Sequence, residues 1–528
     1  MTTCRLVGFG ICAAMLGVMS ACAPPKLTGT LVYARGGESD QLDPIHVDTG
    51  ESVKVIINVF DTLVTYADDS TELVPCLAES WDTSDDGLIW TFHLRDGVSF
   101  HDDTALDSEA VVVSIERLIV PDHPLVFDSV IPYAPDFSVI ESVRAVDRLT
   151  VEFHLREPSA VFLANLAMFC ASIVSPTALE SQGRGFSTAP VGTGPFRMEH
   201  WVRDQQLVLK AFDAHWRGRP QLDRLVFVPV RESAVRGQQL QRGEAHFADD
   251  LPPAELDKLA AHPEIEVQEV PGMNVGYLAM NADRPPLDDR RVRQAVWHMI
   301  DKQRLIDVAY AGQAAPAINP LPRTMPAWHD GLVDRAFDVE EAQGLFREAQ
   351  QDLGFSAPLE LELFVMATPR PYMQQPQETA AFLKESLRPL GIELRIVTSE
   401  TTLHFKRLSG GEHQLALAGW STDNADPDNF LYALLDPDNI NDHGGNNVCR
   451  YRNQTVHELL IEAKRTIDAD KRIELYREAQ ELIFADAPMV PLVHTKVRVA
   501  HRKELRGYQL HPTGLTWMRA AHIEDGQP

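Results

Sequence analysis

Cysteine is scarce in this chain and shows no redox or zinc-binding spacing. The 528 residues contain six cysteines, of which Cys4 and Cys12 lie close to the N-terminus. No two cysteines are spaced as CxxC, which excludes the common zinc and thiol-redox motifs. Three cysteines lie in the body of the chain, namely Cys76, Cys170 and Cys449. We expect them to be buried structural thiols, with at most one disulfide among them.

Positive charge is in deficit as well. The chain has 48 Lys and Arg against 76 Asp and Glu, a formal net charge of −28. This balance opposes binding to the phosphate backbone of nucleic acids and to anionic membrane surfaces. We therefore expect no nucleic-acid partner. Solubility is the simplest reason for the acidity, and electrostatic recruitment of cationic ligands is the alternative.

The chain lacks an apolar run long enough to cross a membrane. Leu6 to Val18 follow Arg5, and this run is shorter than the ~20 residues that a spanning helix needs. Met19-Ser20-Ala21-Cys22 then resembles the bacterial lipobox, in which cleavage leaves a lipid-modified cysteine. We expect an export signal over 1–21, lipidation of Cys22, a tether over 22–30, and a periplasmic or other extracytoplasmic location. Ordinary cleavage within Ala21-Cys22-Ala23, which would release a free periplasmic protein, is the alternative.

The common catalytic signatures are missing too. The sequence contains no GxxxxGK[ST], HExxH or GxSxG motif. His93 and His101 are eight residues apart, and we interpret them as structural or surface histidines rather than a metal pair. Asp426 and Asp428 fit a calcium loop poorly, because Pro437 stands where its closing Glu belongs. We expect no catalytic residue, metal or cofactor, and an extracytoplasmic hydrolase is the rival hypothesis.

Strand and helix signals alternate along the chain, which indicates the α/β class. The length exceeds what one hydrophobic core serves, so two or three lobes are expected. The segments Trp90–Leu94 and Thr150–Leu155 alternate as strands, and we place them in a compact insertion over roughly 67–186.

The stretch 358–420 predicts strand, helix, strand, helix and strand in succession. The expected elements are a strand from Leu359 to near Met366, a helix with Ala380, Leu383 and Leu387 on one face, a strand over Ile392–Val397, a short helix over Thr402–Leu408 and a strand over Leu415–Trp420. Crossover connections of this kind make the strands parallel.

Two opposite charges follow strands of this predicted sheet. Arg370 follows the first strand and Asp423 follows the third. Ligands of open parallel sheets bind beyond the carboxyl ends of the strands. The forked guanidinium suits a carboxylate and the carboxylate suits an ammonium group, so the pair fits a small zwitterion such as a short peptide. Solvated loop charges, or a salt bridge between Arg370 and Asp423, are the alternatives.

Several longer stretches resemble the peptide/nickel family of extracellular solute-binding proteins, and within it the dipeptide-binding branch. The resemblance covers the chain from about Thr30 to the C-terminus. It is carried by Leu77-Ala78-Glu79-Ser80-Trp81, Trp90 to His101, Pro190-Val191-Gly192-Thr193-Gly194-Pro195-Phe196, Pro271 to Leu278 and Pro286 to Ala295.

The resemblance implies a periplasmic-binding-protein-like fold of the Venus flytrap type, with two ligand-binding lobes and an inserted third lobe. We expect lobe I over 31–66, 187–270 and 488–528, the inserted lobe II over 67–186, and lobe III over 271–487. Such a protein is a monomer that hands its ligand to an ABC permease in the membrane and carries no ATPase of its own.

The resemblance also assigns the site residues. It implies that Asp423 binds the α-ammonium of a dipeptide, that Arg370 binds its α-carboxylate, and that Trp420 lies beside the peptide backbone, although a plain core tryptophan is the alternative. Relatives have a cysteine pair near this loop. Here Cys449 matches one member, but Pro437 stands near the other position. The family also includes binders of antimicrobial peptides, haem, nickel chelates, opines and glutathione, and fold alone does not choose among them.

Overall fold

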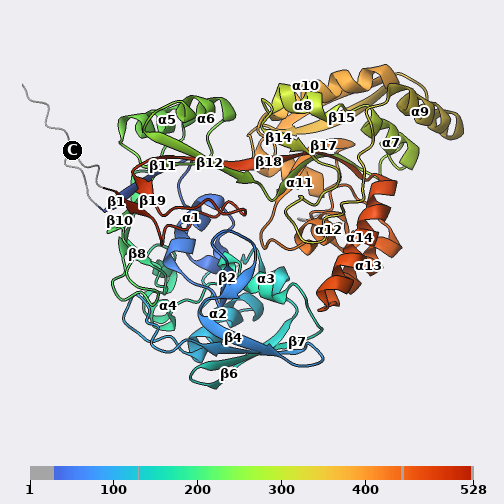
Figure 1. The fold of residues 1–528 in the computed structure, drawn as a ribbon. Coiled ribbons are helices and arrows are strands. Elements are labelled where there is room, and N and C mark those ends of the chain that lie inside the picture. Colours follow the sequence, from blue (N-terminus) through green and yellow to red (C-terminus); the bar gives the residue numbers. More distant parts are fainter. Residues whose placement is uncertain (1–28, 129, 442–444, 525–528) are drawn as a thin grey trace, which may run out of the picture.

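The computed structural model describes residues 29–128, 130–441 and 445–524. The predicted signal, Cys22 and most of the tether lie outside these residues. The ribbon has two halves that are joined by the long strand β18 (Met489–Arg502), drawn in red in Figure 1. No helix in the described ranges is both long and apolar enough to cross a membrane.

A mixed sheet runs through both halves, and β18 is its central connection. Within the described residues this sheet has 12 strands, with the order β16-β15-β17-β13-β18-β11-β1-β10-β9-β8, and β12 and β14 also pair with β18. Besides β18 its strands are β1 (Thr30–Arg35), β8 (Phe196–Val202), β9 (Gln206–Ala211), β10 (Arg224–Pro229), β11 (Phe247–Ala248), β12 (Ile265–Pro271), β13 (Asn274–Met280), β14 (Ala314–Pro316), β15 (Leu359–Met366), β16 (Ile392–Ser399) and β17 (Leu415–Ser421).

The predicted insertion has its own antiparallel sheet, in the order β4-β5-β7-β6. The alternation predicted for β5 and β7 is confirmed, because their phenylalanines Phe92 and Phe153 are fully buried and their rings meet edge to face at 5.3 Å. The strands of this sheet and of two short ribbons are β2 (Val64–Tyr66), β3 (Leu73–Pro75), β4 (Ala78–Thr83), β5 (Ile89–Leu94), β6 (Ile140–Asp147), β7 (Thr150–Leu155), β19 (Leu505–Arg506) and β20 (His522–Ile523).

Helices cover these sheets, as the α/β prediction requires (Figure 1). They are α1 (Gly50–Val59), α2 (Ser108–Ile119), α3 (Phe162–Leu166), α4 (Pro176–Gln182), α5 (Ser233–Arg242), α6 (Pro253–Ala260), α7 (Arg290–His298), α8 (Lys302–Ala309), α9 (Val339–Leu353), α10 (Pro376–Leu387), α11 (Thr401–Ser409), α12 (Asp428–Leu435), α13 (Gln454–Arg465) and α14 (Ala469–Asp486).

The five elements predicted between 358 and 420 are confirmed as β15, α10, β16, α11 and β17. β15 pairs in parallel with both β16 and β17, as the crossover argument predicts. Local sequence explains where the helices start and stop. Pro376 opens α10, and Gly391 takes a left-handed conformation after it. The Glu400 carboxylate caps α11 by accepting from the N–H groups of Thr402 and Leu403.

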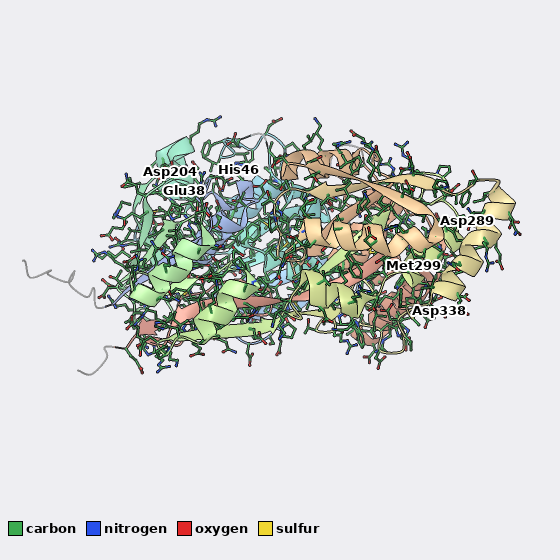
Figure 2. The ribbon with its side chains drawn as sticks, turned by 90° about the horizontal axis from the view of Figure 1, so that it is seen from above. Glu38, His46, Asp204, Asp289, Met299 and Asp338 are labelled. Atoms are coloured by element: carbon green, nitrogen blue, oxygen red, sulfur yellow. The ribbon has the colours of Figure 1, made fainter. Side chains whose placement is uncertain are left out.

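The two halves are distinct when the molecule is viewed from above. Figure 2 shows Glu38 and Asp204 close together in one half, and Asp289 and Asp338 in the other. Glu38 accepts the backbone N–H of Asp204 at 2.7 Å, which ties β8 and β9 to the chain after β1. The lobe boundaries stay predictions.

The three cysteines in the described chain are buried and free. The prediction of buried structural thiols is therefore confirmed for Cys76, Cys170 and Cys449. Burial raises the pKa of the Cys449 thiol to about 12. A thiol in this state is a poor nucleophile and acts as a small apolar side chain.

Candidate functional site

A cavity of about 1000 Å³ brings together residues from distant parts of the chain. The three residues predicted to form the site, Arg370, Trp420 and Asp423, all line it. They come from the loops after β15 and from the end of β17, which are adjacent parallel strands. Other lining residues come from distant segments of the chain, and they include Asp48, Tyr66, Tyr133, Met168, Phe169 and Thr516.

Arg370 stands on a tight turn. Its backbone N–H donates to the carbonyl of Met373 at 3.1 Å, and the N–H of Met373 donates back at 2.9 Å. Its guanidinium carbon lies 5.8 Å from the centre of the Phe405 ring, so the ring of α11 supports the cation from one side. Arg370 is exposed to the cavity and makes no ion pair with any described residue.

Asp423 is held by Asn429, a residue that our sequence predictions did not include. The backbone N–H of Asp423 donates to Oδ1 of Asn429 at 2.9 Å, and Nδ2 of Asn429 donates to the Asp423 carboxylate at 3.3 Å. The indole N–H of Trp420 donates to the same Oδ1 at 2.9 Å. One buried amide in the first turn of α12 thereby orients both predicted site residues.

The Asp423 carboxylate lies in an environment that disfavours its charge. Burial raises its pKa to about 6, and the nearby Asp136 adds to the shift. Hydrogen bonds from Asn429 and Tyr133 act in the opposite direction but do not cancel it. No described residue forms an ion pair with Asp423. A cation beside it would stabilise the ionised form, because an opposite charge at short range lowers the pKa of a carboxyl group.

Asp426 and Asp428, which follow Asp423 closely in the sequence, have structural partners. Asp426 binds the guanidinium of Arg472 through two hydrogen bonds of 2.8 and 2.7 Å. The Asp428 carboxylate lies 3.8 Å from the ammonium of Lys464. Asp423 and Arg370 do not form an ion pair with each other, so the alternative of a local salt bridge is not what the structure shows. The calcium-loop interpretation fails as well, since Asp426 is occupied by Arg472.

His93 and His101, for which the sequence left a metal pair as the alternative, make separate contacts. His93 is exposed and lies 3.0 Å from Asp82, whereas His101 is buried and lies 2.9 Å from the carbonyl of Gly194. Burial lowers the pKa of His101 to about 4, so the ring is neutral.

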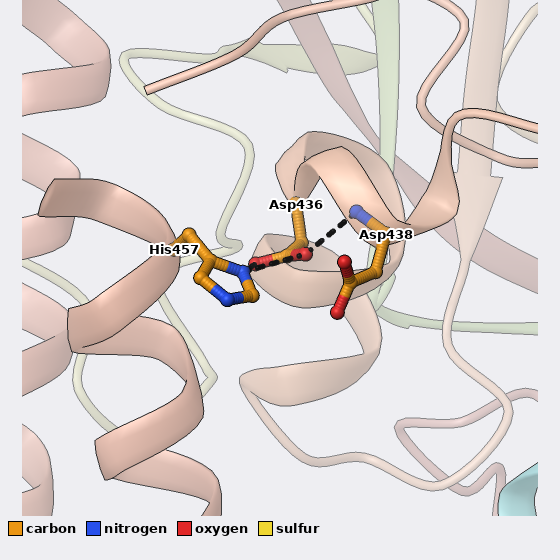
Figure 3. A group of neighbouring side chains, drawn as sticks. All are labelled: Asp436, Asp438 and His457. Atoms are coloured by element: carbon orange, nitrogen blue, oxygen red, sulfur yellow. Dashed lines mark hydrogen bonds and ion pairs between the residues drawn. The ribbon is translucent and has the colours of Figure 1, made fainter. Parts of the chain in front are cut away.

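A different group brings three potential metal ligands within 4.8 Å, namely Asp436, Asp438 and His457. Figure 3 shows the Asp436 carboxylate between the other two. It accepts the backbone N–H of Asp438 at 2.9 Å, and its oxygens lie 3.0 and 3.2 Å from Nδ1 of His457. Asp436 thus caps a short 3₁₀ turn and holds α13 through His457. This group lies outside the cavity that contains Asp423.

Lys54 also lines the cavity, but its ammonium group is already ion-paired with carboxylates of the protein. Its ammonium lies 2.7 Å from Asp249, 2.9 Å from Asp250 and 3.1 Å from Glu51. Lys406 lines the cavity too and makes no ion pair with a described residue. Asp48 and Gly50 line the cavity as well. Tyr66, Tyr133 and Thr516 carried no local sequence signal of a site.

Comparison with known proteins identifies the family of this chain. Residues 72–442 match the family described as bacterial extracellular solute-binding proteins, family 5 Middle. The dipeptide-binding protein of Escherichia coli is 34% identical over 94% of this chain and 95% of its own. Heme-binding protein A of Haemophilus influenzae is 34% identical over 93% of this chain and 92% of its own.

A solved structure is similar over nearly the same length. The periplasmic binding protein DppA of Helicobacter pylori, in complex with the peptide STSA, is 31% identical with a TM-score of 0.81, over 94% of this chain and 98% of its own. The predicted family and the periplasmic-binding-protein fold are thereby confirmed. Such proteins act outside the cytoplasm. This chain belongs to family 5 of the bacterial extracellular solute-binding proteins, close to its dipeptide-binding members.

Proposed function

We propose that this protein captures short peptides, dipeptides above all, and delivers them to the permease of an ABC importer. The observation that carries the proposal is the pair of opposite charges in one cavity, neither of which has an ion-pair partner among the described residues. Arg370 would bind the α-carboxylate through its fork of N–H donors, and Asp423 would bind the α-ammonium. The relatives named for dipeptide binding support the same ligand class.

The charge pair accounts for a preference in length. Each added residue lengthens an extended peptide by ~3.3–3.6 Å. Two fixed charges therefore match one peptide length and leave an ammonium or a carboxylate of a longer peptide without its partner. An unpartnered charge in a closed site is costly, so the mismatch discriminates against longer chains.

The volume of the cavity accounts for tolerance of different side chains. A cavity of about 1000 Å³ leaves room around a dipeptide for side chains of various sizes and for bridging water. The main-chain charges would provide the affinity, and Trp420 would lie against the peptide backbone. We expect little dependence on the ligand's side chains.

Binding would select the closed arrangement of the halves. Closure removes both ligand charges from water, and this is favourable only when each charge meets its partner. Lobes I and III would close by a hinge movement, with lobe II inserted in lobe I, and the closed monomer would dock on the permease. Lipidation of Cys22 would hold the protein at the membrane, and the chain itself would carry out no catalysis.

Mass spectrometry of the ligand released from natively purified protein tests the proposal. Dipeptides in the released fraction support it. Haem, a nickel chelate, an opine or glutathione in their place would overturn it, and peptides that are hydrolysed during incubation would favour a hydrolase.

A further inference from the structure

The cavity contains more charged groups than the two ends of a dipeptide need. Its carboxylate, ammonium and guanidinium groups belong to Asp48, Lys54, Arg370, Lys406 and Asp423. Lys54 is already ion-paired with three carboxylates of the protein. The other four have no ion-pair partner among the described residues, and they do not pair with one another. The proposed function uses Arg370 and Asp423, which leaves Lys406 and Asp48 without a role.

Lys406 stands on the face of α11 that borders the cavity. The residues of this helix that line the cavity are Phe405, Lys406, Leu408 and Ser409. Their three- and four-residue spacing is that of one helix face. Arg407 turns away from this face and pairs with Glu412 at 2.7 Å. Lys406 is exposed and its ammonium has no partner in the described chain, so a molecule in the cavity can reach it.

The same face of α11 supports Arg370. The guanidinium carbon of Arg370 lies 5.8 Å from the centre of the Phe405 ring, and Lys406 is the next residue of the helix. The helix therefore places a second cation at the end of the cavity where Arg370 would bind the α-carboxylate. Two unpaired cations at one end of a cavity favour a ligand that carries more than one negative charge at that end.

We infer that Lys406 binds an acidic side chain on the second residue of the dipeptide and thereby determines a preference for Asp or Glu at that position. This inference rests on the proposed function. The side chain of the second residue starts at the carbon atom that also carries the α-carboxylate, so it begins at the Arg370 end. In an extended peptide the first side chain starts ~3.3–3.6 Å away and points to the opposite face. Lys406 therefore contacts the second side chain only.

An ammonium group on a flexible stem suits this task. Lysine carries three N–H donors at the end of four carbon atoms, so it can follow carboxylates on side chains of different length. It recognises charge rather than size, and neutral side chains of different sizes remain acceptable. The net charge of −28 repels an acidic ligand as a whole. A preference for such a ligand consequently requires a local cation.

Lys384 offers a matched control. It lies in the last turn of α10, as Lys406 lies in the last turn of α11, and both residues are exposed. Lys384 likewise has no ion-pair partner in the part of the chain that the structure describes, but it does not line the cavity. Lys384→Gln and Lys406→Gln thus remove the same charge from the same kind of helix position, and only Lys406 faces the proposed ligand.

The test uses calorimetry at low salt with Ala-Glu and Ala-Gln, two dipeptides that are similar in shape and differ in charge. We expect the wild type to bind Ala-Glu about three- to tenfold more tightly, because an ion pair that water still reaches contributes a modest free energy. Lys406→Gln should bind the two dipeptides equally, and Lys384→Gln should keep the wild-type preference. Glu-Ala should gain no preference over Gln-Ala in any of the three proteins. Added salt should reduce the preference for Ala-Glu.

The outcomes separate the two proposals. A wild type that binds Ala-Glu and Ala-Gln equally overturns the inference and leaves the proposed function intact. An equal loss of affinity for both dipeptides in Lys406→Gln would assign Lys406 to the α-carboxylate and also overturn it. A loss confined to tripeptides would make Lys406 the anchor of a longer chain, with the same consequence. A wild-type protein that binds no dipeptide overturns the proposed function together with the inference.

Discussion

Asn429 and Asp423 hydrogen-bond each other in both directions. Oδ1 of Asn429 accepts the backbone N–H of Asp423 at 2.9 Å, and Nδ2 donates to the Asp423 carboxylate at 3.3 Å. Because Trp420 donates to the same Oδ1, a single amide fixes the loop that carries the proposed ammonium site. Preorganised contacts of this kind increase affinity by reducing what must be ordered on binding.

The first prediction concerns this amide. Asn429→Ala should lower dipeptide affinity by about tenfold or more, because the Asp423 carboxylate loses both its donor and the anchor of its loop. It should also lower the free energy of unfolding by ~1–3 kcal/mol, since the indole N–H of the partly buried Trp420 is left without its acceptor. Calorimetry and denaturant unfolding measure the two effects.

Asn439→Ala is the control for that variant. Nδ2 of Asn439 donates to the carbonyl of Tyr432 at 2.9 Å, and the residue does not line the cavity. This variant should lose stability without losing affinity. Equal affinities in Asn429→Ala and Asn439→Ala would contradict the role assigned to Asn429.

The second prediction concerns the charge pair. Asp423→Asn and Arg370→Gln should each lower dipeptide affinity at least about thirtyfold, because one charge of the ligand remains buried without its partner. Dipeptides in which one terminal charge is blocked test which charge each residue binds. N-acetylated dipeptides should no longer distinguish Asp423→Asn from the wild type, and amidated dipeptides should no longer distinguish Arg370→Gln.

Charges outside the cavity provide the comparison. Arg388 pairs with Glu385 and Asp96 pairs with Arg148, and all four side chains are exposed. Arg388→Gln and Asp96→Asn should leave affinity unchanged, because exposed pairs contribute only ~0–1 kcal/mol to stability and these do not touch the ligand. Wild-type affinity in both cavity variants would refute the assignment of Asp423 and Arg370.

The third prediction is a dependence of binding on pH. The pKa of ligand-free Asp423 is raised to about 6, mainly by burial. Below that value the carboxyl is protonated and no longer attracts an ammonium. Dipeptide affinity should therefore fall about tenfold between about pH 7 and pH 5, and calorimetry across this range measures the fall.

Stability should respond to pH in the opposite sense. A carboxyl whose folded pKa lies above its unfolded value of about 3.9 binds more protons in the folded state, so ligand-free protein gains stability as pH falls from about 6 toward 4. Asp428, whose pKa burial also raises to about 6, adds to this gain. Subtracting the profile of Asp423→Asn isolates the part due to Asp423. An affinity that stays constant over the range would contradict the ionic contact.

Strand alternation and the ends of parallel strands made part of this site predictable. Arg370 and Asp423 could be placed in one crevice because the order of elements from 359 to 421 is local and its periodicity is clear. Their surroundings were not predictable in the same way. Tyr66, Tyr133 and Thr516 reach the cavity through long-range packing, and a tyrosine that faces a ligand has the same sequence signal as one in the core.

Asn429 and Asp426 show a second limit. Both lie within six residues of Asp423 in the sequence, but their roles depend on geometry. Asn429 acts through its two hydrogen bonds to Asp423, and Asp426 pairs with Arg472, which lies 46 residues farther along the chain. The lobe boundaries depend on the same long-range pairing, because β18 belongs to the sheet on both sides of the molecule.

The fourth prediction concerns a buried contact beside the site. Nδ2 of Asn424 donates to Oδ1 of Asn165 at 2.6 Å, and both residues are 4% exposed. The bond ties the loop next to Asp423 to α3 in the predicted lobe II, so it should help to hold the cavity closed. Asn165→Ala should speed dipeptide release several-fold with little change in association, because the proposed hinge opening would have to break this contact before the ligand leaves. Stopped-flow fluorescence measures both rates.

Arg465 and Glu157 form a second contact between the same regions at 2.5 Å, but it is exposed. Glu157→Gln should therefore change release little, and an equal effect of both variants would show that general contact between the regions, rather than the buried amide pair, governs release.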